Sequence, residues 1–110
     1  MPDTEATPLV VRNNDDEIAG GHVADFYDHL LDKGDTEKHA RSRRNQVARL
    51  LKLAKAKRVS HIVPSRIQAG IRQLRDDGRS LQTCNHYLRS AKQFSRWLWR
   101  DGRAAEHTLA

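Results

Sequence analysis

The stretch SLQTCNHYLRSAKQFSRWLWRDGR, from Ser80 to Arg103, has the length of one helix and two chemically different sides. At about 100° of rotation per residue, one side collects the apolar side chains of Cys84, Tyr87, Ala91, Phe94 and Leu98, with Leu88 at its edge. The opposite side carries four cations and one amide within an arc about 80° wide: Asn85, Arg89, Lys92, Arg96 and Arg100, here called the ladder. No carboxylate interrupts the ladder. Ser80 is a good N-cap and Asp101-Gly102 is a stop signal, so the pattern predicts an amphipathic helix from just after Ser80 to about Arg100.

A second segment, from about Thr36 to Lys57, repeats this arrangement. Its apolar side holds Ala40, Val47, Leu50, Leu51 and Ala54, and its opposite side holds Lys38, Arg41, Asn45, Arg49 and Lys52, here called the ridge. A solvated helix face usually mixes charges, because Glu–Lys pairs four residues apart stabilise a helix. The absence of acids within both rows therefore indicates that the cations are placed selectively. Arg43 lies on the apolar side of this segment, and the sequence offers no account of it.

Two further helices and a loop complete the predicted fold. Val23, Phe26, Tyr27, Leu30 and Leu31 have helical spacing within 22–33, with acids outward and Gly34 as the stop. A third helix opens at Pro64, a residue suited to the first helical position, and ends at Asp77-Gly78. We expect Val59 and Ile62 to anchor the preceding loop in the core. With short linkers, no strand-like alternation and no repeat, the pattern predicts an all-α, compact four-helix bundle with neighbouring helices roughly antiparallel.

Charge divides the chain more sharply than its net value of +6 suggests. Residues 1–35 contain two Lys/Arg and nine Asp/Glu, whereas residues 36–110 contain eighteen Lys/Arg and five Asp/Glu. We predict a disordered acidic tail over 1–20, a four-helix domain over 21–104 and the start of a linker over 105–110. A lone Cys84, no apolar run long enough to span a bilayer and no signal-peptide pattern favour a cytoplasmic protein without a membrane partner.

Cations in rows of this kind neutralise phosphates and position a nucleic acid without reading its sequence. Amides and arginines can read base edges, and a helix N-terminus with a serine can seat a phosphate. The predicted DNA-binding residues are Lys38, Arg41, Arg44, Asn45, Arg49, Lys52, Ser80, Thr83, Asn85, His86, Arg89, Lys92 and Arg96. Plainer interpretations remain open for single residues: Ser80 as a cap only, Thr83 as first-turn packing and His86 as an exposed polar side chain. The two rows together favour nucleic acid.

The last segment also resembles a known family. Its Gly78-Arg79-Ser80-Leu81-Gln82-Thr83-Cys84-Asn85, then Phe94-Ser95-Arg96-Trp97-Leu98, then Arg100-Asp101-Gly102-Arg103, is similar to the last helix of the N-terminal core-binding, SAM-like domain of phage integrases and other tyrosine recombinases. The resemblance covers about residues 20–110, and Thr36–Ala40 contributes to it. It implies an orthogonal four-helix bundle whose second and fourth helices face duplex DNA, as half of a clamp that a C-terminal catalytic domain closes.

Two departures from the family pattern are visible. The family often continues with Asn-Pro-Leu, where this chain has Glu106-His107-Thr108-Leu109. The arginine, lysine and histidine residues and the tyrosine nucleophile of the catalytic domain have no counterparts, and Tyr27 and Tyr87 fall on apolar faces. We therefore expect no catalysis from this chain, with DNA cleavage and rejoining assigned to a domain outside it. The expected partners are double-stranded DNA and that domain, with a free monomer that oligomerises on DNA.

The sequence lacks the motifs of metal binding, nucleotide binding and nucleophilic catalysis. The sequence has no zinc spacing, phosphate loop or nucleophile–base pair, so no cofactor is expected, and Cys84 is interpreted as a small buried hydrophobe. Trp97 is expected in the core, and Trp99 is expected to pack on the first helix or under a following domain. Two alternatives stay open: a stand-alone DNA-binding regulator of a mobile element, and a helical adaptor whose basic face binds an acidic protein.

Overall fold

Four α-helices account for most of the part of the chain that the computed structural model describes, residues 21–107 and 109. They are α1 (His22–Asp32), α2 (Glu37–Leu53), α3 (Pro64–Asp76) and α4 (Leu81–Arg100), with a short 3-10 helix, η2 (Val59–His61), before α3. The described residues contain no strand, so the prediction of an all-α protein is confirmed. The predicted tail over 1–20 lies outside the described residues.

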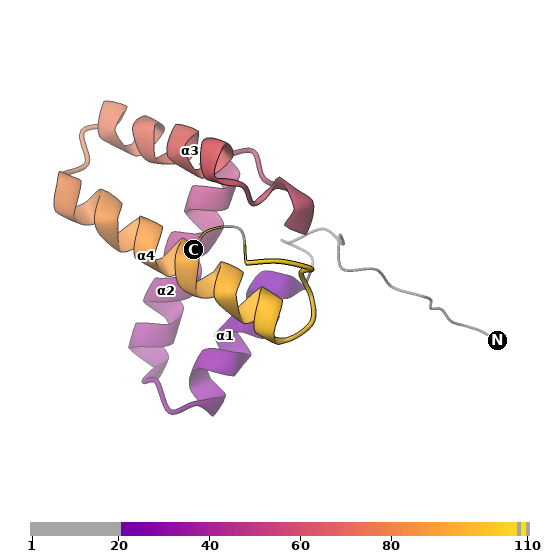
Figure 1. Cartoon of the computed structure of the whole chain (residues 1–110). Coiled ribbons are helices and arrows are strands. Elements are labelled where there is room, and N and C mark those ends of the chain that lie inside the picture. Colours follow the sequence, from indigo (N-terminus) through magenta and orange to yellow (C-terminus); the bar gives the residue numbers. More distant parts are fainter. Residues whose placement is uncertain (1–20, 108, 110) are drawn as a thin grey trace.

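The helices form two hairpins that cross each other (Figure 1). α1 and α2 make one antiparallel pair, and α3 and α4 make the other, as the short linkers predict. The second pair lies across α2 at a steep angle, so α2 contacts all three other helices. The ladder of α4 and the ridge of α2 consequently follow crossing directions rather than parallel ones.

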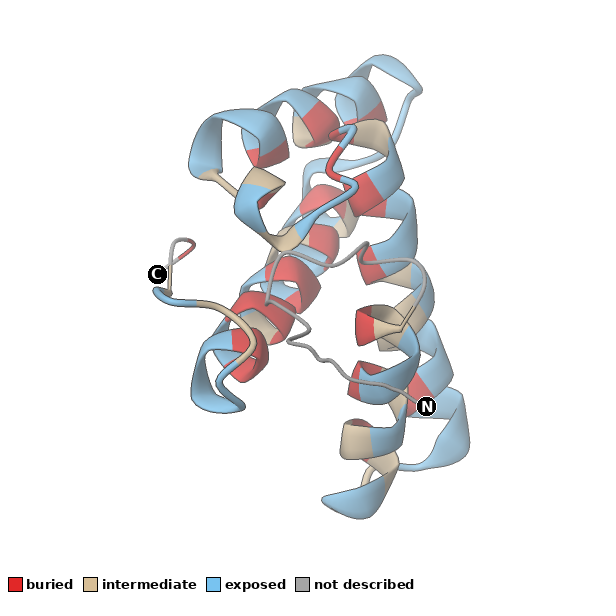
Figure 2. Ribbon diagram, turned by 90° about the vertical axis from the view of Figure 1, so that its right-hand side faces the viewer, coloured by how far each residue is buried: buried red, intermediate tan, exposed pale blue. Residues whose placement is uncertain are grey.

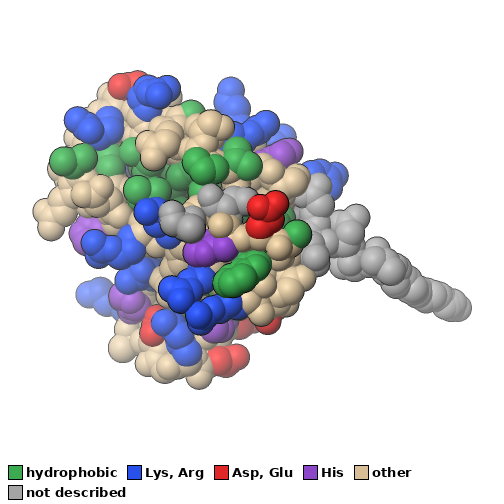
Figure 3. Space-filling model, in the orientation of Figure 1, with side chains coloured by type: hydrophobic (Ala, Val, Ile, Leu, Met, Phe, Trp, Pro, Cys, Tyr) green, Lys and Arg blue, Asp and Glu red, His purple; other side chains and the backbone are tan. Residues whose placement is uncertain are grey.

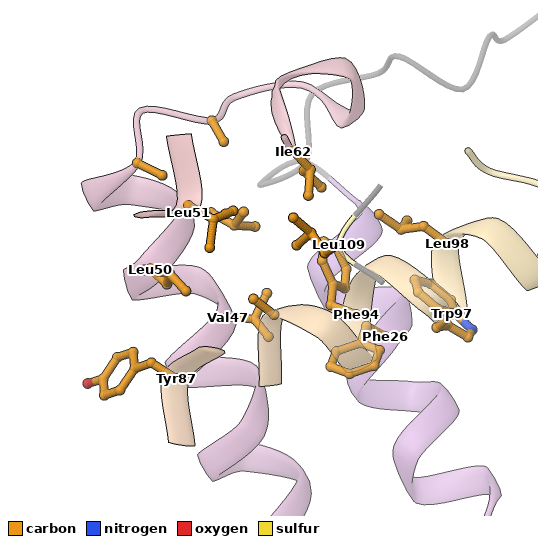
Figure 4. Close-up of a cluster of buried hydrophobic side chains, with 14 of the residues drawn as sticks. Phe26, Val47, Leu50, Leu51, Ile62, Tyr87, Phe94, Trp97, Leu98 and Leu109 are labelled. Carbon is orange, nitrogen blue, oxygen red and sulfur yellow. The ribbon is translucent and has the colours of Figure 1, made fainter. Parts of the chain in front are cut away.

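The core fills the space between the two pairs (Figure 2). Phe26 from α1 meets Phe94 and Trp97 of α4, with ring centroids 5.2 and 5.5 Å apart. Figure 4 shows this aromatic group on one side of the core and the aliphatic side chains of α2 on the other. Ile62 is buried and Val59 packs against the core, so both predicted loop anchors are confirmed, as is the burial of Trp97.

All four helices end in the same way. In each, the N–H two residues beyond the C-cap donates to a carbonyl in the last turn, which is the Schellman arrangement. The donor–acceptor pairs are Asp35 to Leu30 (3.0 Å), Ala56 to Leu51 (2.9 Å), Arg79 to Leu74 (3.0 Å) and Arg103 to Leu98 (2.7 Å). The residue that turns the chain has a positive φ: 107° at Gly34, 57° at Lys55, 93° at Gly78 and 76° at Gly102. Three exits use glycine, and α2 uses a lysine.

This exit corrects the predicted end of the second helix. Regular helix stops at Leu53, four residues before the expected Lys57, because Lys55 takes the left-handed conformation and Ala56 turns into the core. No glycine or proline marks the position, so the sequence gives no stop signal there. The other predicted boundaries, at Gly34, Pro64, Gly78 and Ser80, hold.

The segment after α4 returns to the bundle. Leu109 is buried, and Figure 4 shows it beside Phe94. The His107 ring stacks on Trp99 at 5.9 Å between centroids, with 15° between the ring planes. The prediction that Trp99 packs on α1 is therefore wrong: its neighbour is His107, and 45% of the tryptophan stays exposed.

Candidate nucleic-acid interface

The ladder stands free on the outer face of α4. Asn85, Arg89, Lys92, Arg96 and Arg100 are all exposed, and none of them forms an ion pair within the described residues. The opposite side of α4 is buried from Cys84 to Leu98, so the helix orients the ladder outward by burying its other side. Figure 3 shows Lys, Arg and His side chains gathered below α4 and beside the lower half of α2.

The ridge of α2 is also exposed, but it is less uniformly cationic. Arg41 pairs with Glu37 at 3.3 Å, one turn earlier on the same helix. The Arg44 Nε donates to Asn45 Oδ1 at 3.3 Å. Lys38, Arg49 and Lys52 are exposed without an ion pair in the described part of the chain. One cation of the ridge, Arg41, is therefore neutralised by an acid that lies outside the ridge.

A pair of side-chain hydrogen bonds joins α2 to α4 where they cross. Arg43 NH1 donates to Gln93 Oε1 at 2.7 Å, and Ser90 Oγ donates to Gln46 Oε1 at 2.6 Å. The first bond explains Arg43, because at a crossing its long side chain leaves the apolar side of α2 and reaches the next helix. The second satisfies a buried serine on α4. The two helices therefore meet partly through polar contacts.

Beside this crossing lies a groove with a volume of about 330 Å³. Its lining comes from two helices: His39, Ser42, Arg43 and Gln46 of α2, and His86, Arg89 and Ser90 of α4. Among the residues that the structure describes, no carboxylate lines the groove. One lining residue has a carboxylate near it: Asp35 Oδ2 lies 3.9 Å from His39 Nε2, and Asp35 Oδ1 lies 3.9 Å from Lys33 Nζ. Two arginines and two histidines thus border a concave, polar surface.

A second hollow, of about 560 Å³, lies further along α4. Arg96, Arg100, Gln93, Trp97 and Asp101 line it from α4 and its exit, and His29 and Lys33 line it from α1. The one acid here, Asp101, accepts a hydrogen bond from Arg103 Nε at 2.7 Å. Since Arg89 borders the first hollow and Arg96 and Arg100 border the second, the ladder connects the two.

Arg103 fixes the α4 end of this surface to α1. Its NH1 donates to Asp25 Oδ2 at 2.8 Å, and its guanidinium lies 4.7 Å from the centroid of the Trp97 ring. Burial lowers the pKa of Arg103, but hydrogen bonds and charge from Asp101 and Asp25 outweigh it, so the net shift is upward. The guanidinium therefore stays charged, and its role is to hold the two helices together.

Ten of the thirteen predicted residues line neither hollow, and three of these ten, Arg44, Ser80 and Thr83, have other contacts. The Arg44 guanidinium lies 4.7 Å from the ring centroid of Tyr27 on α1, on the far side of α2 from the groove. Ser80 Oγ accepts the N–H of Thr83 at 3.1 Å and donates to Thr83 Oγ1 at 3.0 Å. Both hydroxyls therefore serve the N-terminus of α4. Of the thirteen predicted residues, the structure brings His86 and Arg89 into the groove and Arg96 into the second hollow.

Sequence reasoning missed several lining residues, which are His39, Ser42, Arg43, Gln46 and Ser90 in the groove and His29, Lys33, Gln93, Trp97, Arg100 and Asp101 in the second hollow. A signal was present for some of them. Arg43 and Ser90 fall on the apolar sides of their helices, and a polar residue in that position usually has a hydrogen-bonding partner on a neighbouring element. His29 and Lys33 carried no such signal, since only the packing of α1 under α4 brings them to the ladder.

Other kinds of site find little support in the described residues. No three His, Cys, Asp or Glu side chains among them are arranged to hold a metal ion. None of the described helices has both the length and the apolar composition needed to cross a bilayer. Compared with protein-family models, with curated proteins and with solved structures, the chain finds no match.

Proposed function

We propose that this chain binds duplex DNA through the outer face of α4 and the groove beside it, as the core-binding part of a tyrosine-recombinase-type integrase. The observation that carries the proposal is the groove between α2 and α4. Its lining includes Arg43, Arg89, His39 and His86 and no acid, and the acid-free ladder continues from it along α4. A surface that concentrates cations and excludes carboxylates favours a polyanion over water.

The ladder suits phosphates better than it suits bases. Arginine and lysine side chains at successive turns of α4 lie about 5–6 Å apart along the helix, close to the spacing of successive phosphates on a strand. Binding to them releases counterions, so affinity falls steeply with salt. Asn85, exposed among these cations, is the residue of the ladder best suited to a base edge.

The integrase part of the proposal rests on the resemblance of residues 78–103 to the last helix of the integrase core-binding domain. It also rests on which helices form the cationic groove. In that family the second and fourth helices face duplex DNA, and here α2 and α4 meet at the cationic groove. Phe94, Trp97 and Leu98 of the similar motif form part of the core that orients the ladder. DNA cleavage and rejoining belong, in this proposal, to a catalytic domain outside the sequence.

The test is a titration with a random-sequence duplex at several salt concentrations. We expect log affinity to fall linearly with log salt, with a slope of about 0.9 per phosphate contact. Arg89→Ala should weaken binding about eightfold at 0.1 M salt by the same relation, while Arg75→Ala, which removes an exposed arginine from α3, serves as the matched control.

Two outcomes would contradict the proposal. Absence of binding at low salt, together with binding to polyglutamate, would favour the adaptor that binds an acidic protein. Equal losses for Arg89→Ala and Arg75→Ala would show that the charge as a whole, and not the groove, attracts DNA. The integrase assignment has its own test, since an open reading frame downstream without a recombinase domain would leave a stand-alone regulator.

A further inference from the structure

The exit of α2 carries an unusual residue. Lys55 adopts a left-handed conformation, with a φ of 57°, in a Schellman turn where the other three helices have glycine. A residue with a Cβ pays for this conformation in free energy, and glycine does not. Local backbone strain of this kind persists where the surrounding structure enforces it, and it is concentrated at functional sites. The position therefore raises the question of what the lysine side chain does.

The turn that holds Lys55 is firmly built. The Lys55 carbonyl accepts a hydrogen bond from Arg66 NH1 at 2.9 Å, and Ala56 is buried. His61 Nδ1 accepts the backbone N–H groups of Lys57 at 3.2 Å and of Arg58 at 3.3 Å. These contacts fix the backbone from 55 to 58, so the side chains of this corner project from a rigid support.

The corner is strongly cationic. Lys52, Lys55, Lys57 and Arg58 are exposed at the C-terminal end of α2, and no carboxylate within the described residues forms an ion pair with the three lysines. In the sequence, residues 38–75 contain twelve Lys/Arg and no Asp or Glu. The negative end of the helix dipole favours cations near an exit, but Lys52 and Lys57 already provide them, so the dipole does not require a lysine at the strained position.

We propose that Lys55, Lys57 and Arg58 form a second contact with the phosphodiester backbone of duplex DNA, which extends the ridge of α2 beyond the end of the helix. The inference rests on the proposed function. Lys52 links the ridge to this corner, and the ridge itself spans a helix of 17 residues, about 25 Å long. A surface of this length faces several successive phosphates. The lysine at the strained position exchanges stability for that contact.

The test is Lys55→Gly, which relieves the strain and removes the charge. We expect the melting temperature to rise by about 4 °C or more, while DNA affinity at 0.1 M salt falls about eightfold and the salt slope falls by about 0.9. Lys55→Arg keeps both charge and strain, so it should leave the melting temperature, the affinity and the salt slope unchanged. Gly34→Lys is the thermal control: a Cβ there meets no atom within 4 Å, so only backbone strain should lower its melting temperature.

The outcomes separate this inference from the function on which it rests. If the unmodified chain binds DNA and Lys55→Gly binds equally well with the same slope, the corner is not a contact, and the groove remains. If Lys55→Gly fails to stabilise the fold while Gly34→Lys destabilises it, the lysine carries no strain and the argument fails. If the unmodified chain does not bind DNA, both proposals fall.

Discussion

α2 and α4 have the same amphipathic design, but the fold uses them differently. α4 buries one side against the other helices and keeps the whole opposite side free, so its ladder borders both hollows. α2, like α4, contacts all three other helices, but its contacts with α1 and α3 are more extensive than those of α4. Its ridge occupies the one side that these neighbours leave open, and no ridge residue lines either hollow.

This difference shows that a cationic row on a helix does not by itself define a binding surface. α2 contributes to the groove through His39, Ser42 and Gln46, which lie between its apolar side and its ridge, and through Arg43 on its apolar side. These residues face α4 because the two helices cross there. The shape of the site therefore comes from the crossing, and its charge comes from residues on both sides of it.

The largest expected effect is on the core, where truncations on α2 and α4 can be compared. Leu50 of α2 and Leu98 of α4 are both fully buried, and each truncation to alanine should cost about 2–5 kcal/mol. We expect the cost of Leu50→Ala to lie near the upper end of this range, because α3 packs directly over Leu50. Leu88→Ala should cost less, about 1 kcal/mol, since Leu88 is only half-buried.

Chemical denaturation of the three variants measures these differences. A Leu88→Ala variant as unstable as Leu98→Ala would contradict the assignment of Leu88 to the edge of the buried side. Equal costs for Leu50→Ala and Leu98→Ala would contradict the larger effect expected where α3 packs over Leu50.

A smaller effect is expected where α3 crosses α2. Gly70 is buried, and a Cβ added there would lie 2.9 Å from Leu50 Cδ1 and 3.3 Å from both the Ala54 nitrogen and the Leu50 carbonyl oxygen. Gly70→Leu should therefore separate the two helices and cost about 1–3 kcal/mol. Gly70→Ala is the control and should cost less than Gly70→Leu, because a gain of about 1 kcal/mol in helix propensity offsets part of the strain from its contacts with Leu50 and the Ala54 nitrogen.

Thermal melting distinguishes the two glycine variants. If Gly70→Leu melts at the same temperature as the parent chain, α2 and α3 have room to separate, and the close crossing contributes little to stability.

The features that could be predicted from the sequence are those that a local pattern controls, namely the buried sides and most of the ends of the helices. Hydrophobic periodicity placed the buried sides of α2 and α4 correctly, and the glycine, proline and serine signals marked most helix ends. The end of α2 escaped prediction because its exit residue is Lys55, whose preference is against the conformation that it adopts. Packing of Ala56 and the bond from Arg66 impose that turn from outside the helix.

The site was less predictable than the fold. The outward direction of the ladder follows from periodicity alone, and all five of its residues are exposed. The hollows depend on the crossing of α2 and α4 and on the place of α1 beneath α4, which no local pattern records. Arg44 illustrates the limit: its angle on the helix wheel gives no indication that Tyr27 lies within reach of its guanidinium.

The smallest expected effect on stability comes from two arginine variants that distinguish the ridge from the ladder directly. Arg49→Ala and Arg89→Ala each remove one exposed arginine, so each should leave the melting temperature nearly unchanged. If the duplex touches both helices, each variant should bind about eightfold more weakly at 0.1 M salt, and the double variant about sixtyfold, because independent phosphate contacts add in free energy.

A duplex confined to α4 and the groove would instead make the double variant equal to Arg89→Ala. Binding measured by fluorescence anisotropy at three salt concentrations decides between these cases, since only a true phosphate contact lowers the salt slope when it is removed. A result confined to α4 would also count against the corner at Lys55, which continues the ridge and not the ladder.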